Sequence, residues 1–317
     1  MNRPSILFMG TPAFALPSLE ALQESPYRVK AVVTPPDRPR GRGMKVTFAP
    51  VKKFALRAGL PVLQPPSLKE PGFWRELEAL EPDLIVTVAY GKILPPALLE
   101  FPPLGAINLH ASRLPAYRGA APINRAIMEG ATITGVTVIR MIDRLDAGDI
   151  IARVSEPILI DDTAGSLHDR LAQKGSRLLL EAVEALATGS AHFKPQDPAA
   201  ASYAPPLRRE EERINWDLKN WELYNHIRGL SPYPGAYTYY QGGRLKILAA
   251  TLPVGETGGN GEPGRPGEVV EVAGEMIRVA TARGTLQLVQ VQPAGRSPMG
   301  AGDFSRGYRV EPGARFG

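Results

Sequence analysis

Residues 83–110 read DLIVTVAYGKILPPALLEFPPLGAINLH and contain two apolar runs with a short connection between them. The first run, 83–91, is continuous, as expected of a central strand whose two faces are both covered. The second run, 105–110, ends in Asn108 and His110 on alternate positions. These two runs predict neighbouring parallel strands, with an amide and an imidazole at the carboxyl end of one of them.

Strand and helix patterns alternate on both sides of this stretch. Strands are predicted at 5–10, 29–34, 60–63, 134–142 and 149–158, and helices at 11–25, 48–59, 72–81, 122–130 and 164–189. This alternation predicts an α/β fold with a doubly wound, mostly parallel, Rossmann-like sheet. The segment PPDRPRGRGMK (35–45) has three prolines and two glycines, so we expect an exposed loop there without regular structure.

A change of composition divides the chain. Residues 190–208 contain four prolines and predict a linker between a catalytic domain, 1–189, and a C-terminal domain, 209–317. After a helix at 221–230, short strands with glycine turns follow, and Gly242-Gly243 has the composition of a hairpin turn. The C-terminal domain is therefore expected to be a small β-barrel or sandwich.

The composition excludes several classes of site. The chain has 317 residues and no cysteine, which rules out disulfides, cysteine metal sites and thiol nucleophiles. No apolar run is long enough for a membrane span or a signal peptide. We expect a cytoplasmic protein, monomeric by default.

Positive charge is concentrated in one segment. The formal net charge is +5, but residues 28–57 hold nine Lys and Arg against one acid, Asp37. Such a patch suggests a polyanionic partner, although a solvated basic surface is the simpler explanation from charge alone.

The candidate chemistry centres on Asn108 and His110. An amide donor beside an imidazole suits the stabilisation of an oxyanion next to a proton acceptor or donor. A later acidic cluster, DRLDAGD (143–149), contains Asp146, which can orient the imidazole. We expect these groups at matching ends of a parallel sheet, with no metal. The alternative is that Asn108 and His110 satisfy backbone groups and that the acidic cluster is a simple turn. The turn after 5–10 reads GTPAFA and lacks G-x-G-x-x-G, so NAD binding is not expected.

These residues resemble a known family. INLHASRLPAYRGAAPI with DRLDAGD downstream is similar to the folate-dependent formyltransferases, whose signature is Asn-x-His, then Ser-x-Leu-Pro, then a distant Asp. The resemblance extends through GTPAFA, PPDRPRGRGMK, VAYGKILP, INWDLKNWELYNHIRGLSPYPGA and VQPAGRSPMGAGDF. The Arg/Gly loop and the β-rich C-terminal domain resemble the members that act on tRNA. Arg113 stands where the motif usually has leucine.

The resemblance implies a reaction and its participants. The formyl donor is 10-formyltetrahydrofolate, and the acceptor is the α-amine of methionine esterified to initiator tRNA, in translation initiation. The amine attacks directly, and Asn108, His110 and Asp146 stabilise the tetrahedral intermediate. The folate site implied by the resemblance comprises Tyr90, Gly91, Ile93, Leu94, Ser112, Arg113, Leu114, Pro115 and Asp143.

The same resemblance implies a tRNA surface. The basic loop offers Arg38, Arg40, Arg42 and Lys45 to phosphates, and Arg42 is flanked by glycines that allow close approach of the backbone. Phe14 is a candidate for the methionine pocket and equally a candidate core residue. The second domain becomes an OB-like barrel, with Lys246, Arg296, Arg306 and Arg309 as possible phosphate contacts.

Three other functions stay open from the sequence. A formyltransferase for a small amine, such as an amino sugar nucleotide or a ribonucleotide, would share Asn108, His110 and Asp146. A formyl-folate hydrolase would use the same site with water as nucleophile. A non-catalytic RNA-binding module is disfavoured by the intact set of three residues.

Overall fold

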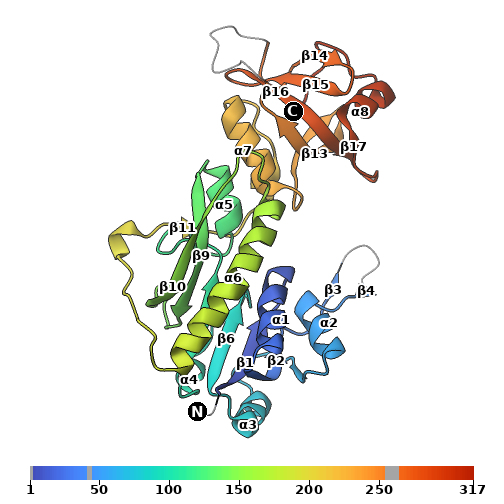
Figure 1. Cartoon of the computed structure of the whole chain (residues 1–317). Helices are drawn as coiled ribbons and strands as arrows, with labels where there is room; N and C mark the ends of the chain where they lie inside the picture. The colour runs from blue at the N-terminus through green and yellow to red at the C-terminus, as the bar shows by residue number, and fades with distance from the viewer. Residues whose placement is uncertain (1–2, 41–44, 254–263) are drawn as a thin grey trace. The chain divides into compact units, whose positions relative to one another are not determined.

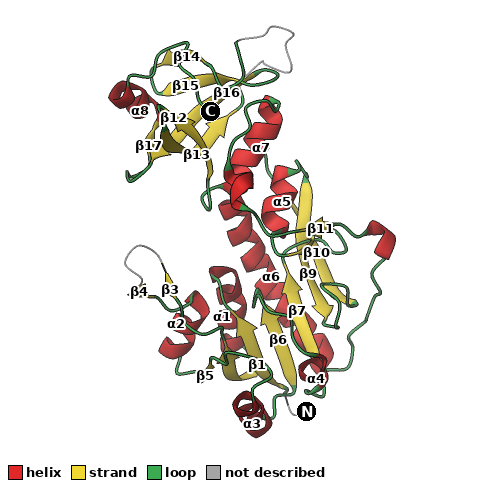
Figure 2. Cartoon of the chain, turned by 180° about the vertical axis from the view of Figure 1, so that it is seen from behind, coloured by secondary structure: helices red, strands yellow, loops and turns green. Residues whose placement is uncertain are grey.

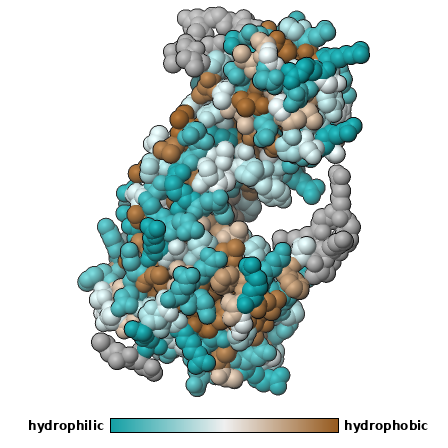
Figure 3. All heavy atoms as spheres, turned by 45° about the vertical axis from the view of Figure 1, so that its right-hand side comes forward, coloured by the Kyte–Doolittle hydropathy of each residue, from teal (hydrophilic) through white to brown (hydrophobic). Residues whose placement is uncertain are grey.

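The computed structural model describes residues 3–40, 45–253 and 264–317, and within them the chain forms two compact units. Unit 1 comprises residues 1–122, 133–157 and 168–204, and unit 2 comprises residues 123–132, 158–167 and 205–317. No helix of the described residues is long and apolar enough to cross a membrane. On the face shown in Figure 3, hydrophobic surface occurs in small patches among hydrophilic residues.

The elements up to the end of unit 1 include a seven-stranded sheet and the helices beside it (Figure 1). In chain order they are β1 (Ser5–Gly10), η1 (Ala13–Ala15), α1 (Leu16–Glu24), β2 (Arg28–Val33), β3 (Pro39–Arg40), β4 (Lys45–Val46), α2 (Pro50–Arg57), β5 (Val62–Leu63), α3 (Pro71–Leu80), β6 (Leu84–Val88), α4 (Pro96–Glu100), β7 (Ala106–His110), β8 (Arg118–Gly119), α5 (Pro122–Met128), β9 (Ile133–Arg140), β10 (Ile150–Pro157), α6 (Ala164–Ala187), η2 (Pro198–Ala200) and β11 (Tyr203–Ala204).

The main sheet has the strand order β10-β9-β7-β6-β1-β2-β5. Strands β7, β6, β1, β2 and β5 are parallel, as expected from the alternation of strands and helices, whereas β9 is antiparallel to β7 and to β10. The predicted mostly parallel α/β sheet is confirmed. Because β9 is antiparallel to β7, however, the connection that follows β9 begins beside the start of β7 and not beside its end.

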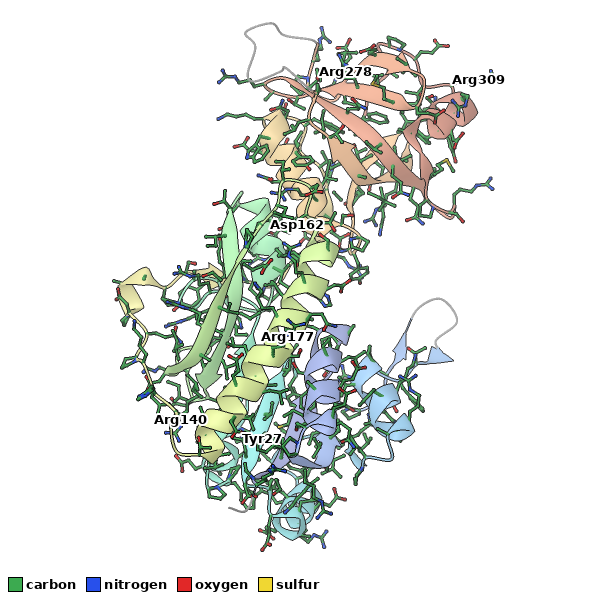
Figure 4. All side chains as sticks on the ribbon, viewed as in Figure 1. Tyr27, Arg140, Asp162, Arg177, Arg278 and Arg309 are labelled. Carbon is green, nitrogen blue, oxygen red and sulfur yellow. The ribbon has the colours of Figure 1, made fainter. Side chains whose placement is uncertain are left out.

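Helices cover both faces of this sheet. Helix α6 lies on one face, beside α1, and the strands β6 and β7 stand in front of it when the molecule is viewed from behind (Figures 1 and 2). Gly175 of α6 permits this contact, because a Cβ there would lie 2.8 Å from a methyl carbon of Leu109. Tyr27 hydrogen-bonds to Glu184 of α6 (Tyr27 is labelled in Figure 4). On the other face, Ile85 and Ala106 share an apolar core with Phe73 and Leu77 of α3 and Leu98 of α4.

One expectation for the basic loop is wrong. Pro39–Arg40, inside this segment, pairs with Lys45–Val46 at its end as the two short antiparallel strands β3 and β4. Proline tolerates the extended backbone of an edge strand, and a pair of two residues needs few ladder hydrogen bonds, so the prolines do not prevent it.

Unit 2 contains the antiparallel strand domain expected at the C-terminus. Its elements after residue 204 are η3 (Arg209–Glu212), α7 (Asn220–Leu230), β12 (Ala236–Tyr240), β13 (Gly243–Thr251), β14 (Val269–Ala273), β15 (Met276–Ala280), β16 (Thr285–Pro293), β17 (Met299–Gly300) and α8 (Ala301–Tyr308). The strand order is β12-β13-β16-β15-β14, with β17 paired to β16. Gln241 and Gly242 both have positive φ, as the tight hairpin between β12 and β13 requires.

Segments from the middle of the chain complete unit 2. The buried Arg228 of α7 donates from Nη1 to the carbonyls of Leu159 and Asp162, both at 3.0 Å, and Asp162 is labelled in Figure 4. Asn124 donates to the carbonyl of Gly229 at 2.8 Å. The two units are therefore not continuous halves of the chain.

Candidate active site

The face of the sheet that carries α3 and α4 turns polar toward the carboxyl ends of β6 and β7. Ile85 pairs with Ala106 in the apolar core, and two residues later Thr87 pairs with Asn108. Side chains two residues apart in a strand share a face, so Asn108 and His110 lie on this face, opposite the one that contacts α6. The predicted pairing of an amide and an imidazole on one strand end is thus present.

Asn108 is held by its neighbour on β6. The Thr87 hydroxyl donates to Oδ1 of Asn108 at 2.7 Å and also lies 3.1 Å from the carbonyl of Ile107. Because the amide oxygen is bound to the sheet, the group that Asn108 presents to a reactant is the donor Nδ2.

His110 is almost fully buried, and one ring nitrogen has a backbone partner. Nε2 lies 2.9 Å from the carbonyl oxygen of Tyr117, and a carbonyl can only accept. Nε2 therefore carries a proton. Nδ1 faces the carboxylate of Asp146, with 3.6 Å between Nδ1 and Oδ2. Nδ1 is consequently the ring nitrogen at which a proton can be gained or lost beside a carboxylate.

Asp146 reaches His110 by an unexpected route. The backbone N–H of Met141, just after β9, donates to the carbonyl of Ala106 at the start of β7 (2.8 Å). Since Asp146 meets His110 at the end of β7, residues 141–146 run back alongside that strand. Asp146 thus lies beside His110 as expected, but the strand before it, β9, is antiparallel to β7 and not parallel as expected.

Backbone conformation fixes the loop that carries Asp146. Asp146 has φ +47°, a left-handed conformation that is costly for a residue with a side chain. The N–H of Gly119 donates to Oδ2 of Asp146 at 2.9 Å. Gly148 has no space for a side chain, because a Cβ there would lie 1.7 Å from the carbonyl oxygen of Arg140. This glycine is required where the loop closes against the end of β9.

The predicted Ser-x-Leu-Pro segment forms a turn against β9. Thr137, which pairs with His110, donates to the carbonyl of Ser112 (2.7 Å) and accepts from the N–H of Leu114 (3.2 Å). The Ser112 hydroxyl donates to the carbonyl of Ala116 at 2.6 Å, and Leu114 is buried. Arg113 is exposed and donates to Ser155 at 3.0 Å. The substituted position of the motif therefore projects outward, while Pro115 is half-buried.

The other residues predicted for the folate site differ in how deeply they are buried. Tyr90 and Leu94 are buried in the apolar core on the α3 and α4 face, with Gly91 at φ +79° between them. Burial raises the pKa of Tyr90 to about 12, and among the described residues its hydroxyl has no hydrogen-bond partner. Ile93 is 82% exposed, and Asp143 is also exposed.

The predicted acceptor residues lie elsewhere on the chain. Phe14 is buried, with its ring edge-on to His168 at 5.3 Å between centroids. Arg38 is exposed, the backbones of Arg40 and Lys45 pair with each other, and Arg42 lies outside the described residues.

Two of the basic residues proposed for the C-terminal domain have intramolecular partners. Lys246 donates to the carbonyl of Pro234 at 2.5 Å. Arg306 forms ion pairs with Asp303 at 2.6 Å and Glu275 at 3.1 Å. Within the described parts of the chain, no group of three or more His, Asp or Glu could hold a metal ion.

Sequence reasoning missed several residues that hold the site. Thr87 had a signal, since it is the polar residue within the apolar run of β6. The carbonyl of Tyr117 and the N–H of Gly119 gave no sequence signal, because every residue other than proline offers the same backbone groups. Gln196, described below, falls in a segment predicted to be a linker.

Comparison with known proteins shows the family to which the chain belongs. Residues 3–183 match the family described as formyl transferase, and residues 206–309 match the formyl transferase C-terminal domain. The chain is 49% identical over 315 residues to the methionyl-tRNA formyltransferase of Moorella thermoacetica, covering 98% of this chain and 99% of that protein. It is 47% identical over 317 residues to the methionyl-tRNA formyltransferase of Syntrophus aciditrophicus, covering all of both chains.

A solved structure shares the fold. The N-formyltransferase of Helicobacter canadensis, in complex with folinic acid and dTDP-3-aminofucose, superposes with a TM-score of 0.67 at 20% identity. That match covers 92% of this chain and 100% of the other. The family matches extend over both predicted domains, and the chain belongs to the formyl transferase family.

Proposed function

We propose that this chain transfers the formyl group of 10-formyltetrahydrofolate to the α-amine of methionine esterified to initiator tRNA. The observation that carries the proposal is the arrangement of Asn108, His110 and Asp146: a fixed amide donor next to an imidazole whose free nitrogen faces a carboxylate. The name shared by the relatives at 47–49% identity supports the same acceptor.

Asn108 supplies charge stabilisation. Attack of a neutral amine on a formyl carbon places negative charge on the formyl oxygen. Nδ2 of Asn108 is an oriented donor for that oxygen because Thr87 fixes the other end of the amide. Loss of one such donor typically costs roughly 3–4 kcal/mol of transition-state stabilisation.

His110 and Asp146 carry out the proton transfers of the reaction. The attacking amine must lose a proton as the new C–N bond forms, and the folate nitrogen must gain one as the old C–N bond breaks. Nδ1 of His110 accepts or donates this proton directly or through a water, and Asp146 stabilises the protonated ring. Nε2 retains its proton and donates it in a hydrogen bond to the Tyr117 carbonyl. The ring therefore does not rotate between accepting the proton of the amine and donating a proton to the folate nitrogen.

The residues near this site fit a folate. The formyl donor supplies an activated acyl carbon, so no covalent enzyme intermediate is needed. Tyr90 and Leu94 offer an apolar wall on the same face of the sheet as Asn108. The Tyr90 hydroxyl, held neutral by burial, is a donor that the polar edge of a pterin would satisfy. We assign Gly91, Ile93, Asp143 and residues 112–115 to the same pocket by family resemblance.

Nucleic acid is the partner that the basic segment suits. Nine Lys and Arg against one acid within residues 28–57 favour contact with phosphates, and Arg38 is exposed there. We assign Arg38, Arg40, Arg42 and Lys45 to the acceptor stem, Phe14 to the methionine side chain, and the C-terminal domain to the rest of the tRNA. Binding that depends on such contacts weakens as salt increases.

The test is formylation with defined acceptors. Purified protein is incubated with 10-formyltetrahydrofolate and charged initiator methionyl-tRNA, with elongator methionyl-tRNA and a reaction without tRNA as controls. We expect formyl-methionine with the initiator alone, and a KM for tRNA that rises with salt.

Two other results would replace the proposal. Consumption of the folate without tRNA would identify a hydrolase. Folate binding without formylation of either tRNA would point to a small amine as the acceptor.

A further inference from the structure

Residues 194–204, predicted to be part of a linker, are hydrogen-bonded to the active-site loops at both ends, through residues 194–196 and 202–204. We call residues 194–204 the return segment. Lys194 exchanges two backbone hydrogen bonds with Ile150 (2.8 and 2.9 Å), and β11 pairs in parallel with β8. Just before the segment, Phe193 stacks under the guanidinium of Arg140, 4.6 Å from the ring centre (Arg140 is labelled in Figure 4). Arg140 is the residue at which β9 ends and the Asp146 loop begins.

Gln196 is the side chain of the return segment that reaches both active-site loops. Its Nε2 donates to the carbonyl of Asp146 at 2.8 Å and to the carbonyl of Gly148 at 2.7 Å. Its Oε1 accepts from the buried Arg118, at 2.7 Å from Nη2 and 3.2 Å from Nε. The amide thus uses both donors and its acceptor in contacts with residues 118 and 146–148.

These contacts lie on both sides of the His110–Asp146 pair. Arg118 stands between Tyr117, whose carbonyl accepts from Nε2 of His110, and Gly119, whose N–H donates to the carboxylate of Asp146. Asp146 itself has the unfavourable φ of +47°, and Gln196 binds the carbonyl of that residue. One amide therefore couples the backbone that orients the imidazole to the backbone that orients the carboxylate.

We propose that Gln196 is a positioning residue for formyl transfer, which holds the Asp146 carboxylate in line with Nδ1 of His110. It touches the reacting groups only through these two loops. This inference rests on the catalytic assignment of His110 and Asp146 in the proposed function. A residue of this kind affects the chemical step more than substrate binding, because a misplacement near 1 Å can cost about 100-fold in rate.

Two substitutions separate the halves of the contact. Gln196→Met keeps the length of the side chain and removes every hydrogen bond. Gln196→Glu keeps an acceptor for Arg118 but places a second oxygen against the carbonyls of Asp146 and Gly148. Lys194→Ala is the matched control, since it removes an exposed side chain of the same segment and leaves its backbone pairing in place.

Steady-state and single-turnover formylation of initiator methionyl-tRNA is measured across pH, together with the melting temperature. For both Gln196 variants we expect kcat to fall about 10- to 100-fold with both KM values within about twofold, the pattern of a lost transition-state interaction. Their pH–kcat profiles should change in the same way as that of Asp146→Asn. Lys194→Ala should behave as the unmodified protein.

The outcomes distinguish this inference from the function on which it rests. A kcat within twofold of the unmodified protein for both Gln196 variants, while Asp146→Asn loses about 100-fold or more, would overturn the positioning role alone. Loss of kcat that follows the melting temperature, with an unchanged pH profile, would also overturn it, as a purely structural role. An active Asp146→Asn would overturn the catalytic assignment itself. If Gln196→Met does not fold, Gln196→Glu decides by the same criteria.

Discussion

Two regions of unit 1 hold the reacting groups, and they do so by different means. Residues 106–110 place Asn108 and His110 through the geometry of a strand, in which alternate side chains automatically share a face. Residues 141–149 place Asp146 through a loop that turns back along β7 with a left-handed residue and a glycine in close contact with Arg140. The return segment then ties that loop to Arg118.

This difference shows that a loop needs additional contacts to position a reacting group, whereas a strand does not. A strand within a sheet is fixed by its ladder hydrogen bonds, so Asn108 needs only Thr87 to orient its amide. A loop has no ladder, and each backbone group in it needs a separate partner. The Asp146 loop obtains backbone partners from Ala106 and Gln196, and the N–H of Gly119 holds the Asp146 carboxylate.

The largest expected effect is at the pair that joins the two regions. His110→Ala and Asp146→Asn should each lower kcat by about 100-fold or more, since a positioned acid–base group contributes 10²–10⁴-fold. The measurement is single-turnover formylation at saturating folate and tRNA. His192→Ala, at an exposed histidine, is the matched control and should retain full activity. Near-normal rates for both site variants would remove the catalytic assignment.

A smaller effect is expected on the strand side. Thr87→Val keeps the shape of the side chain but releases Oδ1 of Asn108, so the amide is free to turn. We expect kcat to fall about tenfold with little change in either KM, because a donor is misaligned rather than removed. Thr87→Ser retains the hydroxyl and should stay close to the unmodified rate. An equal loss in both variants would mean that packing, not the hydrogen bond, matters at residue 87.

Strand-built features of the molecule were predictable from the sequence. Apolar stretches predicted β1, β2, β6 and β7 to within a few residues, and the alternation of Asn108 and His110 predicted that they share a face. The order of helices and strands predicted the α/β class. These signals exist because burial of a strand imposes a pattern on every residue of it.

Loop-built features were not predictable in this way. Nothing in the apolar pattern distinguishes an antiparallel β9 from a parallel one, so the path of the Asp146 loop was expected wrongly. Gln196 lies among prolines and polar residues, and its bonds go to backbone carbonyls that any sequence would offer. When a side chain binds backbone carbonyls, its partner can be any residue, so the sequence contains no complementary residue that would reveal the contact.

The proton on His110 is the most direct test of how the site is built. Two-bond ¹H–¹⁵N spectra of protein labelled at histidine report which ring nitrogen carries hydrogen, and signals absent in His110→Ala assign this residue among the four histidines. For the neutral ring, the geometry predicts hydrogen on Nε2, donated to the Tyr117 carbonyl, and a bare Nδ1 facing Asp146. Hydrogen on Nδ1 instead would contradict the account, because the nitrogen beside the carboxylate would then have no vacancy for the proton of the attacking amine.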